Sequence, residues 1–157
     1  VKGYLLPMIK GGLAGFIRER SIDLVMHMLD YTDVVGKVGI KDFVDEGNRW
    51  LMNRGFMRQN FVLTAFAMDM AEYFPGVVDR DSDTYVGSNA KKCLKLILPT
   101  MSNDKALRYL CESTGGHSKP YDMEDVACDF IRYLDNFQSK EHIESNFGIK
   151  YYNNVHK

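Results

Sequence analysis

The sequence has few cysteines and no pattern that would join them. Cys93, Cys111 and Cys128 are an odd number of residues, stand far apart and include no C-x-x-C pair. This argues against the disulfide framework of a small secreted domain. Because each cysteine falls in an apolar helical context, we expect three buried, free thiols in a reducing compartment.

Long apolar runs and a strong charge of one sign are also missing. The longest strongly apolar stretch, residues 61–70, is interrupted by Thr64 and Asp69 and is too short to span a bilayer, so no membrane partner is expected. The N-terminus shows no signal-peptide pattern, and the chain begins at Val1, so we expect a processed or partial product that is not secreted. A formal net charge of −1 excludes a strongly basic nucleic-acid binder of the histone type. It still permits a narrow basic groove on a neutral surface.

No metal-binding pattern is complete. Asp79, Asp81 and Asp83 alternate as in a calcium loop, but Thr84 replaces the required glycine and Ala90 replaces the bidentate glutamate. We therefore expect a solvated acidic loop there and no metal site.

Catalytic motifs are missing as well. The glycine-rich segment 11–15 lacks the Lys-Ser/Thr ending of a phosphate loop. No H-E-x-x-H, Cys/His or G-x-S-x-G spacing involves the four histidines, His27, His117, His142 and His156. The sequence therefore predicts a protein that is not an enzyme and that takes no cofactor and no small-molecule substrate.

The apolar residues recur at helical spacing, and no segment alternates convincingly at period two. The pattern predicts an all-α fold: one domain over residues 1–157, built as an irregular bundle of six or seven helices with little or no strand. Residues 1–12 and 147–157 are expected as flexible terminal arms. The first expected helix starts from Leu13, and Ser21 could restart it. The next is capped by Asp42 and breaks at Gly55, and a central, buried helix covers 56–74. Shorter helices are expected over 88–98, 102–115 (capped by Ser102 and stopped by Gly115-Gly116), 122–134 (capped by Asp122) and 139–146 (capped by Ser139). The helix over 122–134 has the clearest apolar stripe, made of Met123, Val126, Ala127, Phe130, Ile131 and Leu134.

Cationic residues stand on predicted apolar helices in two places, and the first group lies among aromatic residues. Guanidinium groups beside aromatic rings can bind phosphate while the rings stack on bases, which holds single strands without sequence readout. Alternatively, the arginines form salt bridges with Asp42, Asp45 and Glu46 on a solvated face. The residues concerned are Arg49, Arg54 and Arg58 around Trp50, Phe56 and Phe61, and Lys91, Lys92 and Lys95 on one helical stretch.

Arg58 and Asp129 are charges within apolar stripes. Arg58 falls in the most apolar predicted helix, and Asp129 lies between Cys128 and Phe130. An unpaired buried charge costs several kcal/mol. We therefore expect a buried or semi-buried contact between Arg58 and Asp129.

Three short segments resemble coat proteins of flexuous filamentous plant viruses, the potyvirus-like and potexvirus-like group. Met57-Arg58-Gln59, with Phe61 and Phe66, is similar to that family's Leu-Arg-Gln helix, and residues 127–130, Ala-Cys-Asp-Phe, are similar to its Ala-Phe-Asp-Phe motif. Residues 140–143, Lys-Glu-His-Ile, are faintly similar to a third segment. The resemblance implies an all-helical core, a groove in which Arg58 and Asp129 hold genomic RNA, and terminal arms that link neighbouring subunits in a virion or in host cytoplasm.

We therefore expect a self-assembling, nucleocapsid-like subunit that binds single-stranded RNA without sequence specificity. Arg58 would contact phosphate, Asp129 would orient Arg58, and the cationic field would come from Arg54, Lys91, Lys92 and Lys95. The alternative is a helical protein–protein interaction module, such as a viral adaptor that grips a host helix in an apolar groove. RNA binding by a coat should depend on salt, whereas partner binding by an adaptor should not.

Overall fold

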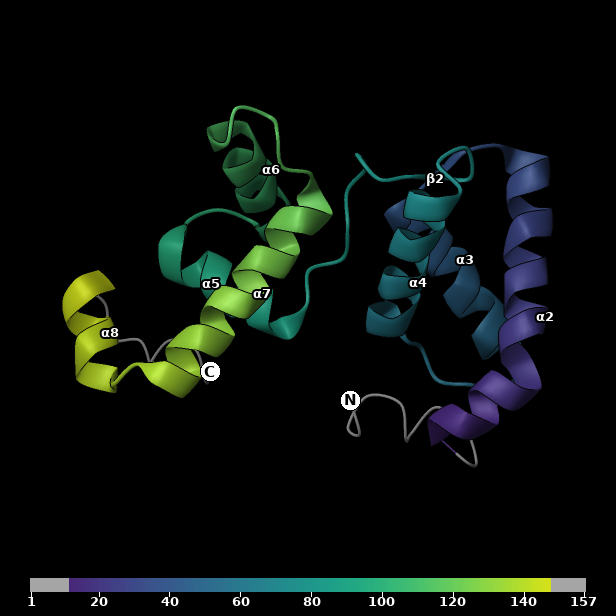
Figure 1. Ribbon diagram of the computed structural model, residues 1–157, viewed down its shortest axis with the longest axis horizontal. Coiled ribbons are helices and arrows are strands. Elements are labelled where there is room, and N and C mark those ends of the chain that lie inside the picture. Colours follow the sequence, from purple (N-terminus) through teal and green to yellow (C-terminus); the bar gives the residue numbers. More distant parts are fainter. Residues whose placement is uncertain (1–11, 148–157) are drawn as a thin grey trace. The chain divides into compact units, whose positions relative to one another are not determined.

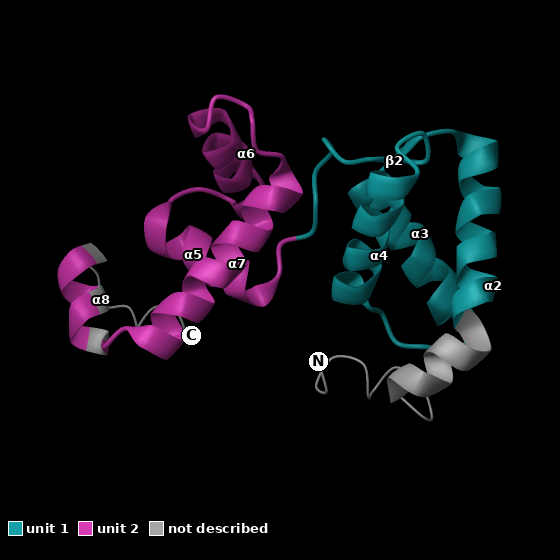
Figure 2. Cartoon of the chain, in the orientation of Figure 1, with its two compact units in different colours: residues 1–85 teal, residues 86–157 magenta. Residues whose placement is uncertain are grey.

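The computed structural model describes residues 12–147 and confirms the all-α fold class. Seven helices, α2 to α8, account for most of these residues, and two strands of two residues each complete the secondary structure (Figure 1). The chain divides into two compact units, residues 1–85 (unit 1) and 86–157 (unit 2), shown in Figure 2. The region predicted as a single domain thus consists of two units. The predicted arms fall mainly on residues 1–11 and 148–157, outside the described residues.

Unit 1 contains α2 (Gly12–Val35), α3 (Ile40–Met52) and α4 (Asn60–Tyr73). Strands β1 (Val38–Gly39) and β2 (Val78–Asp79) pair in parallel, with Val38 opposite Val78. Helix α2 runs without interruption through Ser21, so the expected restart there is wrong. Helix α3 begins at Ile40, before the predicted cap Asp42, and the chain turns at Gly55, whose φ is +80°.

The core of unit 1 forms where α3 packs against α4. A Cβ at Gly47 of α3 would lie 3.0 Å from a methyl carbon of Leu63 of α4, so the missing side chain allows the two helices to approach closely. The prediction of one helix over residues 56–74, buried all round, is wrong. Residues 56–59 precede α4, and Phe61 and Phe74 are exposed at its two ends. The large side chains that are fully buried in this unit include Met28, Ile40, Phe43, Leu51 and Leu63.

Unit 2 contains α5 (Ser88–Ile97), α6 (Asn103–Ser113), α7 (Pro120–Phe137) and α8 (Lys140–Phe147). Their bounds agree closely with the predicted ones, and the expected Ser139 cap is confirmed because its Oγ accepts a hydrogen bond from the His142 N–H at 3.1 Å. Asp122 is not the N-cap of α7. It is the third helical residue, and its carboxylate accepts a hydrogen bond from the Lys119 N–H at 3.3 Å.

The core of unit 2 lies between α5 and α7. Ala90, Cys93 and Leu96 of α5 are buried together with Ala127, Ile131 and Leu134 of α7, and a smaller cluster of Leu94, Ala106 and Leu107 includes α6. One member of the predicted apolar stripe of α7 behaves differently, because Val126 is 61% exposed. None of the helices in the described residues is long and apolar enough to cross a membrane.

Candidate nucleic-acid interface

Arg58 lies in the segment between α3 and α4, and a buried asparagine fixes that segment. The side-chain oxygen of Asn48 accepts a hydrogen bond from the Gln59 N–H at 2.6 Å, and its amide nitrogen donates to Asn60 Oδ1 at 2.8 Å. Asn48 itself is almost completely buried in α3. These two hydrogen bonds hold the beginning of α4 against α3 and thereby fix the backbone position of the preceding residue, Arg58.

The Arg58 guanidinium has three polar neighbours in unit 1. Nη2 lies 2.8 Å from Asp45 Oδ1 and 3.2 Å from the Tyr85 hydroxyl, while Nε donates to Asn60 Oδ1 at 2.9 Å. The Tyr85 hydroxyl also donates to Asp45 at 2.7 Å. Burial, followed by this hydrogen bond to Asp45, raises the pKa of Tyr85. The alternative of arginine salt bridges on a solvated face is therefore confirmed at Arg58, whose side chain is 53% exposed.

Asp129 is exposed on α7 and pairs within its own helix. Its Oδ1 lies 3.2 Å from Arg132 Nη1, and its side chain is 65% exposed. Arg58 belongs to unit 1 and Asp129 to unit 2, and the expected contact between them stays a prediction. Each of the two charges has an oppositely charged partner within its own unit.

The other arginines near α3 are also engaged. The Arg54 guanidinium carbon lies 4.0 Å from the centre of the Trp50 ring, and Nη1 donates to the Trp50 carbonyl at 3.3 Å. Arg49 forms a salt bridge with Glu46, three residues earlier. Arg54 remains exposed beside its ring, so its charge is available to a ligand.

Glu46 has a second partner, which the sequence did not predict. His27 Nε2 of α2 lies 2.8 Å from Glu46 Oε1, and the Glu46 side chain is only 9% exposed. Glu46 stands three residues after Phe43 and four before Trp50, on the apolar face of α3, so its burial could have been predicted. His27, on a separate helix, carries no such signal.

The three lysines of α5 are arranged differently. Lys91 and Lys95 are exposed one helical turn apart, and Lys92 is half-buried. None of the three forms an ion pair with any residue between 12 and 147 that the structure describes. Lys91 and Lys95 therefore present uncompensated positive charge on one face of α5.

The acidic segment 79–83 forms ion pairs with residues on both sides of it in the sequence. Asp79, at the end of β2, lies 3.1 Å from Lys37 Nζ, and Arg80 Nη1 lies 2.5 Å from a carboxylate oxygen of Glu72 of α4. Within the part of the chain that the structure describes, no group of three His, Cys, Asp or Glu side chains could hold a metal ion.

The candidate cations thus fall into two classes. Arg49 and Arg58 are neutralised by carboxylates, and Arg54 stacks on a ring, whereas the α5 lysines have no ion-pair partner among residues 12–147 as described. In comparisons with known proteins, no family model, no curated protein and no solved structure matches this chain.

Proposed function

We propose that this chain is a self-assembling, coat-like subunit that binds single-stranded RNA without sequence preference through α5. The observation that carries the proposal is the pair of exposed lysines, Lys91 and Lys95, on one helical face, for which the described part of the chain provides no ion-pair partner. A lysine that has no carboxylate partner can bind a phosphate without first breaking an ion pair. Release of counterions from the RNA then drives binding.

The RNA contacts proposed here differ from those expected at first. Lys91 and Lys95 make the main phosphate contacts, and the half-buried Lys92 contributes less. Arg54 and Arg58 belong to unit 1 and are a separate set of candidate phosphate contacts. Arg58 must leave Asp45 before its guanidinium can bind a phosphate bidentately. Asp129 is left out of this set because its carboxylate pairs with Arg132 of its own helix.

A salt titration of oligouridine binding, followed by fluorescence anisotropy, tests the proposal. For a single strand, each phosphate contact contributes about 0.7 to the slope of log K against log salt. We expect Lys91→Ala and Lys95→Ala each to lower the slope by about that amount, equally for oligouridine and oligoadenosine. Lys92→Ala should lower it less.

Lys105→Ala is the matched control. Lys105 of α6 is also exposed and unpaired among the described residues, so the substitution removes the same charge from another helix. It should leave the slope unchanged. If the wild-type chain does not bind oligouridine at low salt, or if the α5 variants keep the wild-type slope, RNA binding is wrong and the protein–protein interaction module becomes the better hypothesis.

A further inference from the structure

Helix α5 presents one polar strip to solvent. The side of the helix that packs against α6 and α7 is apolar and buried. Between residues 88 and 96 the exposed positions are Ser88, Lys91 and Lys95. They follow one another by three and four residues, so they lie along one side of the helix. We call these three residues the α5 strip, and the half-buried Lys92 lies at its edge.

The backbone below the strip is fixed, whereas its two ammonium groups are not. The Gly87 N–H, immediately before the strip, donates a hydrogen bond to Glu124 of α7 at 2.8 Å. No carboxylate in the described part of the chain forms an ion pair with Lys91 or Lys95. Each ammonium therefore remains at the end of a flexible stem above a helix that is held in place.

Two lysines in this arrangement recognise charge and not shape. An ammonium is a compact point charge and lacks the planar fork with which a guanidinium orients a phosphate. Lys91 and Lys95 are separated by about 6 Å along the helix axis, so each can contact a different phosphate of one chain. The hydroxyl of Ser88 adds one uncharged donor at the beginning of the strip.

The sequence around the strip provides no ring on which a base could stack. Residues 86–108 contain no Phe, Trp, Tyr or His. Phe130 of α7 packs against the core that includes α5 and is half-buried. Base stacking needs the open face of an aromatic side chain. The α5 strip thus offers contacts to phosphates and none to bases.

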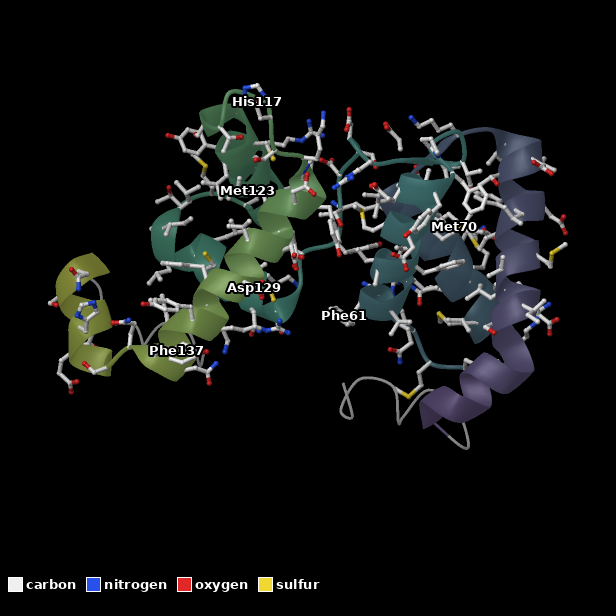
Figure 3. All side chains as sticks on the ribbon, in the orientation of Figure 1. Phe61, Met70, His117, Met123, Asp129 and Phe137 are labelled. Carbon is white, nitrogen blue, oxygen red and sulfur yellow. The ribbon has the colours of Figure 1, made fainter. Side chains whose placement is uncertain are left out.

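The rings that the sequence placed beside arginines belong to unit 1. Trp50 is only 4% exposed, and the Arg54 guanidinium lies over its ring, so a base cannot stack there. Phe61 is exposed near the start of α4, as Figure 3 shows. Its contribution to binding can therefore be separated from that of the α5 strip by substitution.

We propose that the α5 strip binds a chain of phosphates by charge alone, so that its ligand class is a linear phosphate polymer. The phosphates can be joined through nucleosides, as in RNA, or directly to one another, as in inorganic polyphosphate. This inference rests on the proposed function because it uses the same lysines. It goes further because neither a base nor a ribose is required.

Displacement of labelled oligouridine from the full chain, followed by fluorescence anisotropy, tests the ligand class. The competitors are oligouridine, oligodeoxyuridine and inorganic polyphosphate with the same number of phosphates. Polyphosphate should displace the label at an equal or lower phosphate concentration. Oligodeoxyuridine should match oligouridine within about twofold, because the strip makes no contact that requires the 2′-hydroxyl.

Variants of the two lysines locate the site. Lys91→Ala combined with Lys95→Ala should weaken the binding of all three polymers and lower the oligouridine salt slope by about 1.4, twice the value for one contact. Lys91→Arg combined with Lys95→Arg keeps both charges and should bind all three at least as well as the wild type. Displacement by polyphosphate that the alanine variant leaves unchanged would assign the phosphate site to other residues and overturn the proposal.

Removal of exposed rings is the control for base contacts. Phe61→Ala, Tyr109→Ala and Tyr133→Ala should each leave the affinity for oligouridine unchanged. If polyphosphate does not displace oligouridine, or if one of these variants weakens oligouridine binding but not polyphosphate binding, bases contribute and the phosphate-only inference is wrong. RNA binding itself would then still stand. A wild-type chain that binds neither polymer would contradict both proposals.

Discussion

Asn48 accepts a hydrogen bond from the backbone N–H of Gln59 at 2.6 Å, and this contact joins the middle of α3 to the segment that precedes α4. The same amide donates to Asn60, and Asn60 in turn accepts from Arg58. One buried side chain therefore fixes both the start of α4 and the position of the Arg58 guanidinium.

Replacement of Asn48 by alanine should destabilise unit 1. It leaves the Gln59 N–H and the Asn60 side chain without their buried partner, and we expect the free energy of unfolding to fall by about 1–3 kcal/mol. Urea unfolding followed by circular dichroism measures the loss. Asn53→Ala, at an exposed position just after the same helix, is the control and should change stability by less than about 0.5 kcal/mol. Equal effects of the two substitutions would contradict the assigned role of Asn48.

The salt bridge between Arg58 and Asp45 should contribute little to stability but should restrain RNA binding. Because both side chains are about half exposed, Arg58→Ala should cost no more than about 1 kcal/mol. Asp45→Asn should release the guanidinium and raise the affinity for oligouridine at low salt. Asp33→Asn, at an exposed position of α2, makes the same change in net charge and should raise the affinity less. An Asp45→Asn chain that binds no better than the Asp33→Asn chain would show that Arg58 lies outside the RNA-binding surface.

Glu124 should make the stability of unit 2 depend on pH. Its carboxylate accepts a hydrogen bond from the Gly87 N–H at 2.8 Å, just before α5, but burial raises its pKa above the ordinary value of 4.5. Because folding raises this pKa, the folded state is favoured most at pH values below 4.5, and that advantage is lost as pH rises through the raised pKa.

Two variants separate the charge of Glu124 from its hydrogen bond. Glu124→Gln keeps an acceptor for Gly87 without the charge, so it should gain stability relative to the wild type as pH rises above 4.5. Glu124→Ala also loses the acceptor and should be destabilised by about 1–3 kcal/mol. Urea unfolding at several pH values measures both effects. A constant difference between Glu124→Gln and the wild type at every pH would contradict the raised pKa.

The three cysteines are free, and they should differ in reactivity toward a bulky thiol reagent. Burial raises the pKa of Cys93 to about 11, so little thiolate is present near neutral pH, and the sulfur is also shielded. Cys111 and Cys128 are half-buried, and burial raises their pKa values too. We expect Cys111 and Cys128 to be modified first and Cys93 only after unfolding, as mapped by mass spectrometry of labelled peptides. Rapid modification of Cys93 in the folded chain would contradict its burial between α5 and α7.

The sequence by itself determined the helices of unit 2 closely, because helix formation depends on neighbours along the chain. Hydrogen bonds run between residues four apart, and serine, glycine and proline mark the ends. Ser102, Ser139 and the Gly115-Gly116 pair accordingly predicted helix ends that the structure confirms. The apolar core of α7 at Ala127, Ile131 and Leu134 was predicted for the same reason.

Only the tertiary structure decided which charges meet and which apolar face is covered. Arg58 pairs with Asp45, thirteen residues away in the sequence, and Glu46 pairs with His27, nineteen residues away. Both contacts depend on how separate helices pack. Periodicity gave Val126 and Ile131 equal weight as core residues, yet α5 covers one face of α7 and leaves the other to solvent. The sequence of a helix specifies which side chains lie on each of its faces, but it does not specify which face a neighbouring helix covers. The direction of burial is therefore fixed by packing between elements, and so are the partners of Arg58 and the exposure of Val126.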